Sequence, residues 1–309
     1  MVLDNEIIEI LACPRCKQKL DDLDCSDCRL TFPEVGGVPV LLNEENSLFK
    51  ISDLTELQDT TYRKASQLKA AVKGILPSIT LNVNTRENFQ QFFALLLRNS
   101  ARPRLLVIGG AVPGQGLEDV PPEIEMVETD IAIGPRTSIS CDAHDLPFLD
   151  GSFDGVVAQA VLEHVLQPAE CVSEILRVLK KGGIVYAETP FMQQVHAGRY
   201  DFMRFTHLGH RYLFRDFSEI TSGACCGPAS AFVWSYCYFL QSFFRSKTLG
   251  QIAFTVGTLT SFWIKYFDLF LANRPNAYDA SSGYFFLGEK NDTPLTGIDL
   301  IAGYKGMIQ

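Results

Sequence analysis

Residues Cys141–Val165 read CDAHDLPFLDGSFDGVVAQAVLEHV, and this stretch decides the fold. A turn signal, Asp150-Gly151-Ser152, leads into the short apolar run Phe153–Ala158. Such a run is typical of a parallel strand that is covered on both faces. The residues after it, Gln159–His164, then lie at the carboxyl end of the strand, where open α/β sheets bind ligands. We therefore expect Asp142 and the Gln159–His164 turn to form part of a cofactor pocket.

The segments on either side alternate between strand and helix in the same way. The predicted strands are Leu105–Ile108, Ile124–Thr129, Phe153–Ala158, Ile184–Glu188 and Ser282–Gly288. A helix is predicted at Ala169–Leu179, and the Lys180-Lys181-Gly182-Gly183 run is expected to end it through charge and glycine capping. Alternation of this kind predicts an α/β fold with a doubly wound, mostly parallel sheet.

The N-terminal residues 1–46 are predicted to be a separate small unit. They carry two C-x-x-C pairs, formed by Cys13, Cys16, Cys25 and Cys28. Thiolates at this spacing close a tetrahedral site whose usual occupant is zinc, and four thiolates leave no open position for catalysis. We therefore expect structural Zn²⁺. The following run TFPEVGGVPVLL predicts a hairpin around Gly36-Gly37.

The rest of the chain is divided into two parts. Residues 47–100 are expected to form a helical linker and covering helices, with amphipathic patterns at 54–76 and 84–97. Residues 101–309 are expected to form the α/β domain, with an apolar helical insertion at about 228–275. The runs 220–244 and 248–264 contain no charged residue, but glycine and proline interrupt them, so they are too short to span a bilayer. Buried helices are the favoured interpretation, and a membrane-surface face is the alternative.

Composition narrows the class of protein. The 309 residues are 47% hydrophobic and 20% charged, an ordinary globular balance. A net charge of -9 without a Lys/Arg cluster argues against nucleic acid as the main partner. The first residues lack the positive segment of a secretory signal, and the cysteine distribution suits a reducing compartment. We expect a cytoplasmic protein, with peripheral membrane association as the alternative.

The turn after the first strand has the chemistry of a nucleoside site. Its glycines, at 109, 110, 114 and 116, allow backbone to approach a bound nucleoside closely. An acid about twenty residues on, Asp130 or Glu128, is placed to bind ribose hydroxyls. The spacing is not the G-x-G-x-x-G of dinucleotide sites, and Pro113 lies inside it.

Residues 104–190 resemble class I S-adenosylmethionine-dependent methyltransferases, close to the type-11 group. The matching pieces are LLVIGGAVPGQG, VETD, DAHDLPFLDGSFDGVVAQAVLEHV and EILRVLKKGGIVYAETP. The resemblance implies a Rossmann-like, seven-stranded sheet and S-adenosylmethionine as cofactor. It implies cofactor contacts from Gly109, Gly110, Gly114, Gly116, Asp130, Asp142, Ala143 and Gln159. By the same resemblance the glycines face methionine, Asp130 the ribose, Asp142 the adenine amino group and Gln159 the methyl donor.

The N-terminal cysteine pairs with GGVPVLL resemble a small zinc-ribbon protein that activates tRNA, rRNA and protein methyltransferases as a separate subunit. That resemblance implies a similar module fused in cis, covering apolar surface of the methyltransferase domain. One departure from the methyltransferase pattern is Val107, which stands where the family usually has an acid.

The acceptor is expected to bind near the loop after the fifth strand. Candidate bases are the four histidines His164, His196, His207 and His210, and the predicted catalytic set is His196, Asp201, Arg204 and His207. His164 is expected to be mainly a supporting residue under the site. His207 and His210 lie three apart, but no further ligand is evident, so no second metal site is expected.

These patterns predict a methyltransferase acting on an unidentified small-molecule, glycan or lipid-linked acceptor. Three alternatives remain open: an RNA methyltransferase, a non-catalytic methyltransferase-like binding module, and a nicotinamide-linked oxidoreductase on the same kind of sheet. Val107 and the long glycine turn motivate the non-catalytic alternative.

Overall fold

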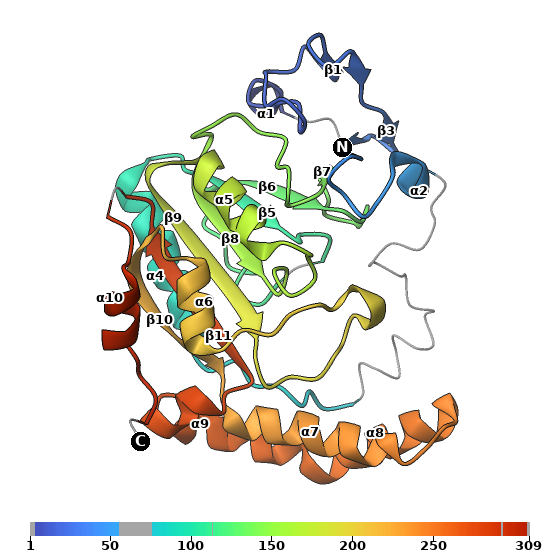
Figure 1. Cartoon of the computed structure of the whole chain (residues 1–309), viewed down its shortest axis with the longest axis vertical. Coiled ribbons are helices and arrows are strands. Elements are labelled where there is room, and N and C mark those ends of the chain that lie inside the picture. The colour runs from blue at the N-terminus through green and yellow to red at the C-terminus, as the bar shows by residue number, and fades with distance from the viewer. Residues whose placement is uncertain (1–3, 56–75, 113, 292, 308–309) are drawn as a thin grey trace.

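The computed structural model describes residues 4–55, 76–112, 114–291 and 293–307, and its centre is a twisted sheet covered by helices (Figure 1). Within these residues the sheet has nine strands in the order β10-β11-β9-β8-β5-β6-β7-β4-β3. Their bounds are β3 Glu34–Val35, β4 Val38–Leu41, β5 Arg104–Ile108, β6 Glu125–Asp130, β7 Ile139–Cys141, β8 Phe153–Gln159, β9 Leu179–Pro190, β10 Ser218–Cys226 and β11 Gly283–Glu289. The run from β4 to β9 is parallel, whereas the pairs β9–β11, β11–β10 and β3–β4 are antiparallel.

The predicted strands are confirmed, and their burial explains them. In β5, Leu106 and Ile108 join one apolar cluster, while Leu105 and Val107 join another on the opposite face. Alternate side chains of a strand point to opposite faces, so both faces of β5 are covered. Strand β6, which follows β5 in the sequence, pairs with one edge of β5, and the later strand β8 pairs with its other edge. This switch opens a crevice at the carboxyl ends of β5 and β8.

Helix α4 (Thr85–Asn99) covers one face of the sheet, and α5 (Pro168–Val178) packs against the other. Gly155 of β8 lets α4 approach closely, because a Cβ there would lie 2.8 Å from Leu96 Cδ2. The helix predicted at 84–97 is therefore confirmed as a covering helix. The predicted amphipathic segment 54–76 lies almost wholly outside the described residues, which resume at residue 76 after the short α2 (Ile51–Thr55).

The expected glycine cap of α5 is wrong. The helix ends at Val178, and Leu179 already has extended backbone and pairs with Phe153. The following Lys-Lys-Gly-Gly run lies inside β9, where the register shifts between Phe153 and Gly155. Gly182 has φ 74°, a left-handed conformation that glycine adopts easily, so this glycine allows the irregular register of β9 and does not cap a helix.

The N-terminal ribbon is joined to the main sheet, which makes the sheet longer than the seven strands expected. It contains α1 (Asn5–Ile8), the antiparallel pair β1 (Asp24–Cys25) and β2 (Leu30–Thr31), and the predicted β3–β4 hairpin. Gly36 and Gly37 have φ 61° and 78°, as the tight hairpin turn requires. Strand β4 pairs in parallel with β7 through Val40–Ser140 and Leu41–Cys141. In Figure 1 the ribbon lies at the β7 side of the sheet.

A helical layer lies along the opposite end of the molecule (Figure 1). It consists of α7 (Pro228–Ser242), α8 (Lys247–Ser261), the 3-10 helix η2 (Phe262–Phe267), α9 (Asp268–Leu271) and the 3-10 helix η3 (Pro275–Asp279). The remaining elements are η1 (Gly198–Tyr200), α6 (His207–Leu213) and α10 (Gly297–Ala302). Among the helices described, none is long and apolar enough to cross a membrane.

The expectation that the apolar helices are buried is wrong for one face of this layer. Large apolar side chains remain exposed at positions 232, 239, 243 and 244 of the α7 segment and at 249, 252, 256 and 259 of α8. Further exposed apolar residues follow at 263, 266, 267, 269 and 270. We call these thirteen residues the apolar face. The two helices approach closely at Gly257, where a Cβ would lie 3.1 Å from Cys237 Cα, and Tyr238 packs against Phe254 in the same contact.

Candidate functional site

The first of two adjoining cavities lies at the carboxyl ends of β5, β6 and β7. It has a volume of about 260 Å³, and its lining includes Gly109, Asp130, Asp142 and Ala143. These four residues come from three separate strand ends, and the sequence analysis assigned all four to the cofactor. The structure brings them together around one cavity.

Asp130 ends β6 and holds the glycine turn against this cavity. Its carboxylate accepts hydrogen bonds from the backbone N–H of Ala111 (3.2 Å) and of Ala132 (2.9 Å). Burial raises the pKa of Asp130 above its ordinary value, although these backbone bonds oppose the shift. Each carboxylate oxygen has two acceptor positions, so one on each remains for a ligand hydroxyl.

Asp142 follows β7 and is held from both sides. It accepts a bond from Ser47 Oγ at 2.5 Å, and its other oxygen lies 2.6 Å from His144 Nδ1. Burial alone would raise the pKa of Asp142, but the hydrogen bonds from His144 and Ser47 outweigh it and hold the pKa below its ordinary value. The residues after Ser47, Leu48 and Phe49, also line the cavity. This contribution from the N-terminal segment was missed, and no local pattern in the sequence signals it.

The four glycines of the turn have different surroundings. Gly109 has φ 76° and lines both cavities, and a Cβ there would lie 2.5 Å from Val161 Cγ2. Gly114 lines the second cavity beside Gln159. Gly110 and Gly116 pack instead against Glu128 and Phe89 and line neither cavity in the described part of the chain. Direct cofactor contact by these two stays a prediction that the structure does not favour.

The second cavity, of about 450 Å³, adjoins the first, since Gly109, Ala160 and His164 line both. Gln159, at the tip of β8, projects here and donates from Nε2 to Glu188 Oε2 at 2.8 Å. Glu188 is buried, which raises its pKa, and Thr85 also donates to it at 2.9 Å. The second cavity is therefore lined by polar side chains that hold one another in place through hydrogen bonds.

Three further side chains gather at this joint. Glu163 Oε1 lies 3.6 Å from His164 Nε2 and 3.8 Å from His196 Nε2. His164 lines both cavities, so the expectation that it mainly supports the site from below is wrong. His196 lines the second cavity, where it was predicted to face the acceptor. The sequence analysis did not use Glu163, although its place beside His164 in the turn after β8 was a usable signal.

Asp201 and Arg204 brace the loop that carries His196. The Arg204 guanidinium pairs with Asp201 and also donates to the carbonyls of Gln193 (2.7 Å) and Gln194 (3.1 Å). Burial by itself would raise the pKa of Asp201, but the hydrogen bonds from Arg204 outweigh it and lower the pKa below its ordinary value. Neither residue is among those lining the two cavities described. The geometry thus suits positioning of the loop, and direct catalytic contact stays a prediction.

His207 lies away from both cavities. It is buried with its ring against Tyr278 and Tyr284, and its Nε2 lies 3.0 Å from Ser222 Oγ. Burial lowers its pKa to about 4. His210 is equally buried, one turn further along α6. The structure therefore gives no geometric support to the predicted catalytic role of His207.

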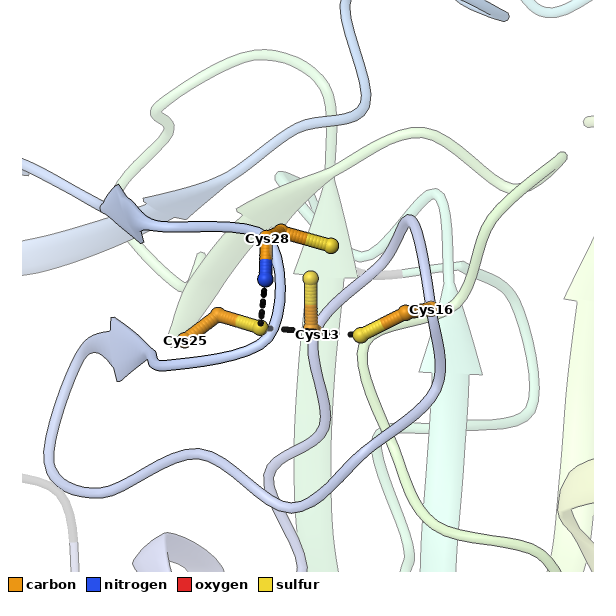
Figure 2. Close-up of side chains that lie close together, drawn as sticks. All are labelled: Cys13, Cys16, Cys25 and Cys28. Atoms are coloured by element: carbon orange, nitrogen blue, oxygen red, sulfur yellow. Dashed lines mark hydrogen bonds between the residues drawn. The ribbon is translucent and has the colours of Figure 1, made fainter.

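The four ribbon cysteines converge as the spacing predicts (Figure 2). One sulfur from each lies within 4.8 Å of the others, and Cys16 Sγ and Cys25 Sγ are 3.5 Å apart. Zinc–sulfur bonds of about 2.3 Å place tetrahedral sulfurs about 3.8 Å apart, so the set fits Zn²⁺. The backbone N–H of Cys28 also donates to Cys25 Sγ at 3.4 Å. Cys13, Cys16, Cys25 and Cys28 therefore have the arrangement predicted for the ligands of a structural zinc.

Comparison with known proteins agrees with this geometry for the N-terminal ribbon and for the central part of the chain. Residues 116–187 match the family model described as a methyltransferase domain. The N-terminal segment is 39% identical over 62 residues to a UPF0434 protein of Azoarcus sp. (strain BH72), covering 18% of this chain and 100% of that protein. The chain carries a class I S-adenosylmethionine-dependent methyltransferase domain and a UPF0434-type zinc ribbon.

Two other similarities are more limited. A 63-residue stretch of the methyltransferase is 47% identical to the demethylmenaquinone methyltransferase of Clavibacter sepedonicus, over 19% of this chain and 26% of that protein. The chain thus spans about a quarter of that relative's length. The solved N-methyltransferase NodS from Bradyrhizobium japonicum, in complex with S-adenosylhomocysteine, is 14% identical with a TM-score of 0.38, over 67% of this chain and 87% of that one. This second likeness concerns the fold alone.

Proposed function

We propose that this methyltransferase transfers a methyl group from S-adenosylmethionine to an acceptor bound in the second cavity. The observation that carries the proposal is the joint between the cavities at Gly109, Ala160 and His164. A cofactor whose adenosine fills the first cavity extends toward this joint, and an acceptor in the second cavity then meets its reactive end. Direct displacement needs this alignment of nucleophile, methyl carbon and sulfur.

The residues of the first cavity bind and orient the adenosine. Asp130 accepts from the ribose hydroxyls, Asp142 accepts from the adenine amino group, and Ala143 lies beside the ring. When bound, S-adenosylmethionine supplies a methyl carbon activated by a positively charged sulfur. The negative and polar oxygens of Glu188 and Gln159 lie near that end, which favours the positive charge.

The residues of the second cavity hold the acceptor and its proton. In the transfer, the carbon–sulfur bond breaks and a bond forms from the methyl carbon to the acceptor atom, which releases its proton. Burial lowers the pKa of His196, so its imidazole is neutral at pH 7 and can take that proton at Nε2. Asp201 accepts from the backbone N–H of His196 at 2.8 Å and thereby fixes the loop.

Cofactor binding tests this proposal directly. We expect micromolar binding of S-adenosylhomocysteine by calorimetry, and a loss of at least tenfold in Asp130→Ala. Asp119→Ala is the control, because Asp119 is exposed on the same turn region and lines neither of the cavities described. Wild-type protein that binds no S-adenosylhomocysteine at millimolar concentration would rule the proposal out in favour of a non-catalytic module.

The acceptor class follows from the apolar face, and we infer that it is a lipid-linked molecule met at a membrane surface. Thirteen large apolar side chains of this layer are exposed, an arrangement that suits contact with lipid. The exposed charged residues of the segment 228–272 are Arg245 and Lys247, whereas Lys265 and Asp268 are buried, in a chain of net charge -9. A basic, aromatic-rich face is attracted to anionic lipid headgroups.

This face is also connected to the acceptor loop. Tyr238 of α7 donates from its hydroxyl to the carbonyl of Val195 at 2.6 Å, and Gln194 donates to Ser235 at 3.0 Å. His196 follows directly, so a membrane under α7 would bring a lipid-linked acceptor close to the second cavity.

Sedimentation with vesicles tests the membrane inference. We expect binding to vesicles containing phosphatidylglycerol, and weaker binding in Phe239→Ser/Phe243→Ser because each exposed phenylalanine contributes about 1.5–3 kcal/mol on burial. The control is Tyr212→Ser, an exposed aromatic residue on α6 outside the apolar face. Equal sedimentation of the wild type with and without vesicles would contradict the inference.

A further inference from the structure

The side chains of Glu163, His164 and His196 form a group that the methyltransferase fold does not explain; we call it the EHH cluster. Glu163 and His164 come from the turn after β8, and His196 comes from the loop after β9. One ligand atom from each lies within 4.8 Å of the others, and the two histidine Nε2 atoms are 3.6 and 3.8 Å from Glu163 Oε1. Metal–ligand bonds of about 2.1 Å place tetrahedral ligands about 3.4 Å apart. The EHH cluster is a slightly expanded version of that geometry.

Glu163 is the decisive member, because it is buried without a partner. Its side chain has no exposed surface, and no other described residue donates a hydrogen bond to either carboxylate oxygen. An ionised carboxylate in such a place is costly unless a cation or donors accompany it. The nearby Arg204 does not fill the need, since its guanidinium is committed to Asp201.

The two imidazoles are oriented as metal ligands are. His164 Nδ1 lies 2.7 Å from the carbonyl of Tyr200, so it donates there and leaves the Nε2 lone pair directed toward Glu163. His196 Nδ1 faces Asp201 Oδ2 at 3.5 Å, which leaves its Nε2 for the same point. Contacts from the second ring nitrogen to a carbonyl or carboxylate typically fix metal-bound histidines. Both Nε2 atoms are thus directed at the Glu163 carboxylate.

We propose that Glu163, His164 and His196 bind a divalent transition-metal cation such as Zn²⁺, separate from the zinc of the ribbon. Two imidazoles and one carboxylate suit such a cation, and three protein ligands leave a position open. That position faces the second cavity, which Glu188 and Gln193 also line.

The proposal changes the expectation about metals and the role of His196. The sequence analysis considered only His207 and His210 and expected no second metal, whereas the structure brings the Glu163-His164 pair to His196 across a separate loop. With the cation bound, His196 is a ligand and not the base. This step rests on the proposed function. The open position would take a hydroxyl oxygen of the acceptor, and the hydroxyl would lose its proton to solvent because the cation lowers the pKa of that hydroxyl. That oxygen then forms the bond to the methyl carbon as the carbon–sulfur bond breaks.

Calorimetric titration of Zn²⁺ into full-length protein whose ribbon is already loaded tests the site. We expect one further equivalent with micromolar affinity. Glu163→Gln and His196→Asn should each weaken it at least tenfold, while Glu87→Gln, an exposed glutamate of α4, should leave it unchanged. Co²⁺ provides a second readout, because the ribbon thiolates give strong sulfur-to-metal absorption and a cation held by nitrogen and oxygen does not.

Two results would overturn the metal site: no second equivalent at millimolar Zn²⁺ in the wild type, or unchanged affinity in both variants. His196 is partly exposed in a loop, so His196→Asn keeps the test valid if Glu163→Gln fails to fold. S-adenosylhomocysteine is titrated into the same samples to separate the two proposals. Protein that binds it but takes no second cation refutes the metal site alone, and protein that takes the cation but not the nucleoside refutes the proposed function alone.

Discussion

Replacing Asp142 with asparagine tests the proposed contact of this residue to the adenine. The substitution keeps the size of the side chain and one acceptor oxygen, but it removes the charge and turns the other oxygen into a donor. In the structure Asp142 accepts from Ser47 Oγ, His144 Nδ1 and the His144 backbone N–H. A donor amide in that place opposes both the Ser47 hydroxyl and the adenine amino group. The substitution therefore removes one charge-assisted hydrogen bond to the cofactor.

Hydrogen bonds to charged groups contribute about 1.5–3 kcal/mol, so we expect the Kd for S-adenosylhomocysteine to rise roughly ten- to a hundredfold. Calorimetry measures it, with Asp145→Asn as the matched control. Asp145 lies three residues further along the same loop and accepts from Lys17, Asn43 and Asn46, but it does not line the first cavity. Both variants lose a carboxylate held by the N-terminal segment, and only one loses the adenine contact.

A ligand analogue decides whether the loss occurs at the adenine. The inosine analogue of S-adenosylhomocysteine has a carbonyl in place of the 6-amino group, so it cannot donate to Asp142. We expect Asp142→Asn to bind this analogue at least as well as the wild type does. Equal weakening of both ligands, or no weakening of either, would refute the assignment of Asp142 to the adenine amino group.

Three further predictions concern the ribbon, a buried ion pair and the sheet. Removing the ribbon zinc by chelation should lower the Tm and weaken S-adenosylhomocysteine binding, because β4 pairs with β7 beside Asp142; an unchanged affinity in fully metal-free protein would contradict this. Burial by itself would lower the pKa of His144, but the Asp142 carboxylate, helped by Glu170 and Asp145, raises it above its ordinary value of about 6.5. The charged His144 therefore stabilises the fold fully below pH 6.5, and this contribution is lost as the pH rises through the raised pKa. Denaturant unfolding should show His144→Asn costing more stability at pH 6 than at pH 9, and the reverse order would disprove the coupling. Gly155→Val should destabilise the protein by about 1–3 kcal/mol, since its side chain meets Leu96 and Phe92, while Gly297→Ala, with open space around it, should be neutral in the same thermal unfolding assay.

Much of the fold follows from patterns that are local in the sequence. The short apolar runs of β5 and β8 are buried on both faces, so their composition alone identifies them as central strands. The cysteine spacing fixes the ribbon ligands for a similar reason, because each C-x-x-C pair forms one side of the site within a single turn. Asp130 and Asp142 are predictable as well, since each directly follows a strand and so lies at the ligand-binding edge.

The failures occur where a local pattern has two structural outcomes. Lys-Lys-Gly-Gly has the composition of a helix cap, but it lies in β9 because strand pairing with β8 begins at Leu179. An uncharged helix can be buried or can present its large side chains outward, and α7 and α8 do the latter. Periodicity shows which residues share a face, but it does not show whether that face meets protein or solvent.

The stretch Cys141–Val165 by itself determined a strand, its ligand-binding end and an acid beside it, because these features depend on residues that are neighbours in the chain. Only the tertiary structure decided what meets that stretch. Ser47, 95 residues away, closes on Asp142, and His196 approaches Glu163 and His164 from another loop. Such contacts depend on how whole elements pack, here the pairing of β4 with β7 and the bracing of the His196 loop by Arg204. No short segment encodes that packing, and for this reason the strand-end residues of the first cavity were readable from the sequence while the N-terminal contact and the EHH cluster were not.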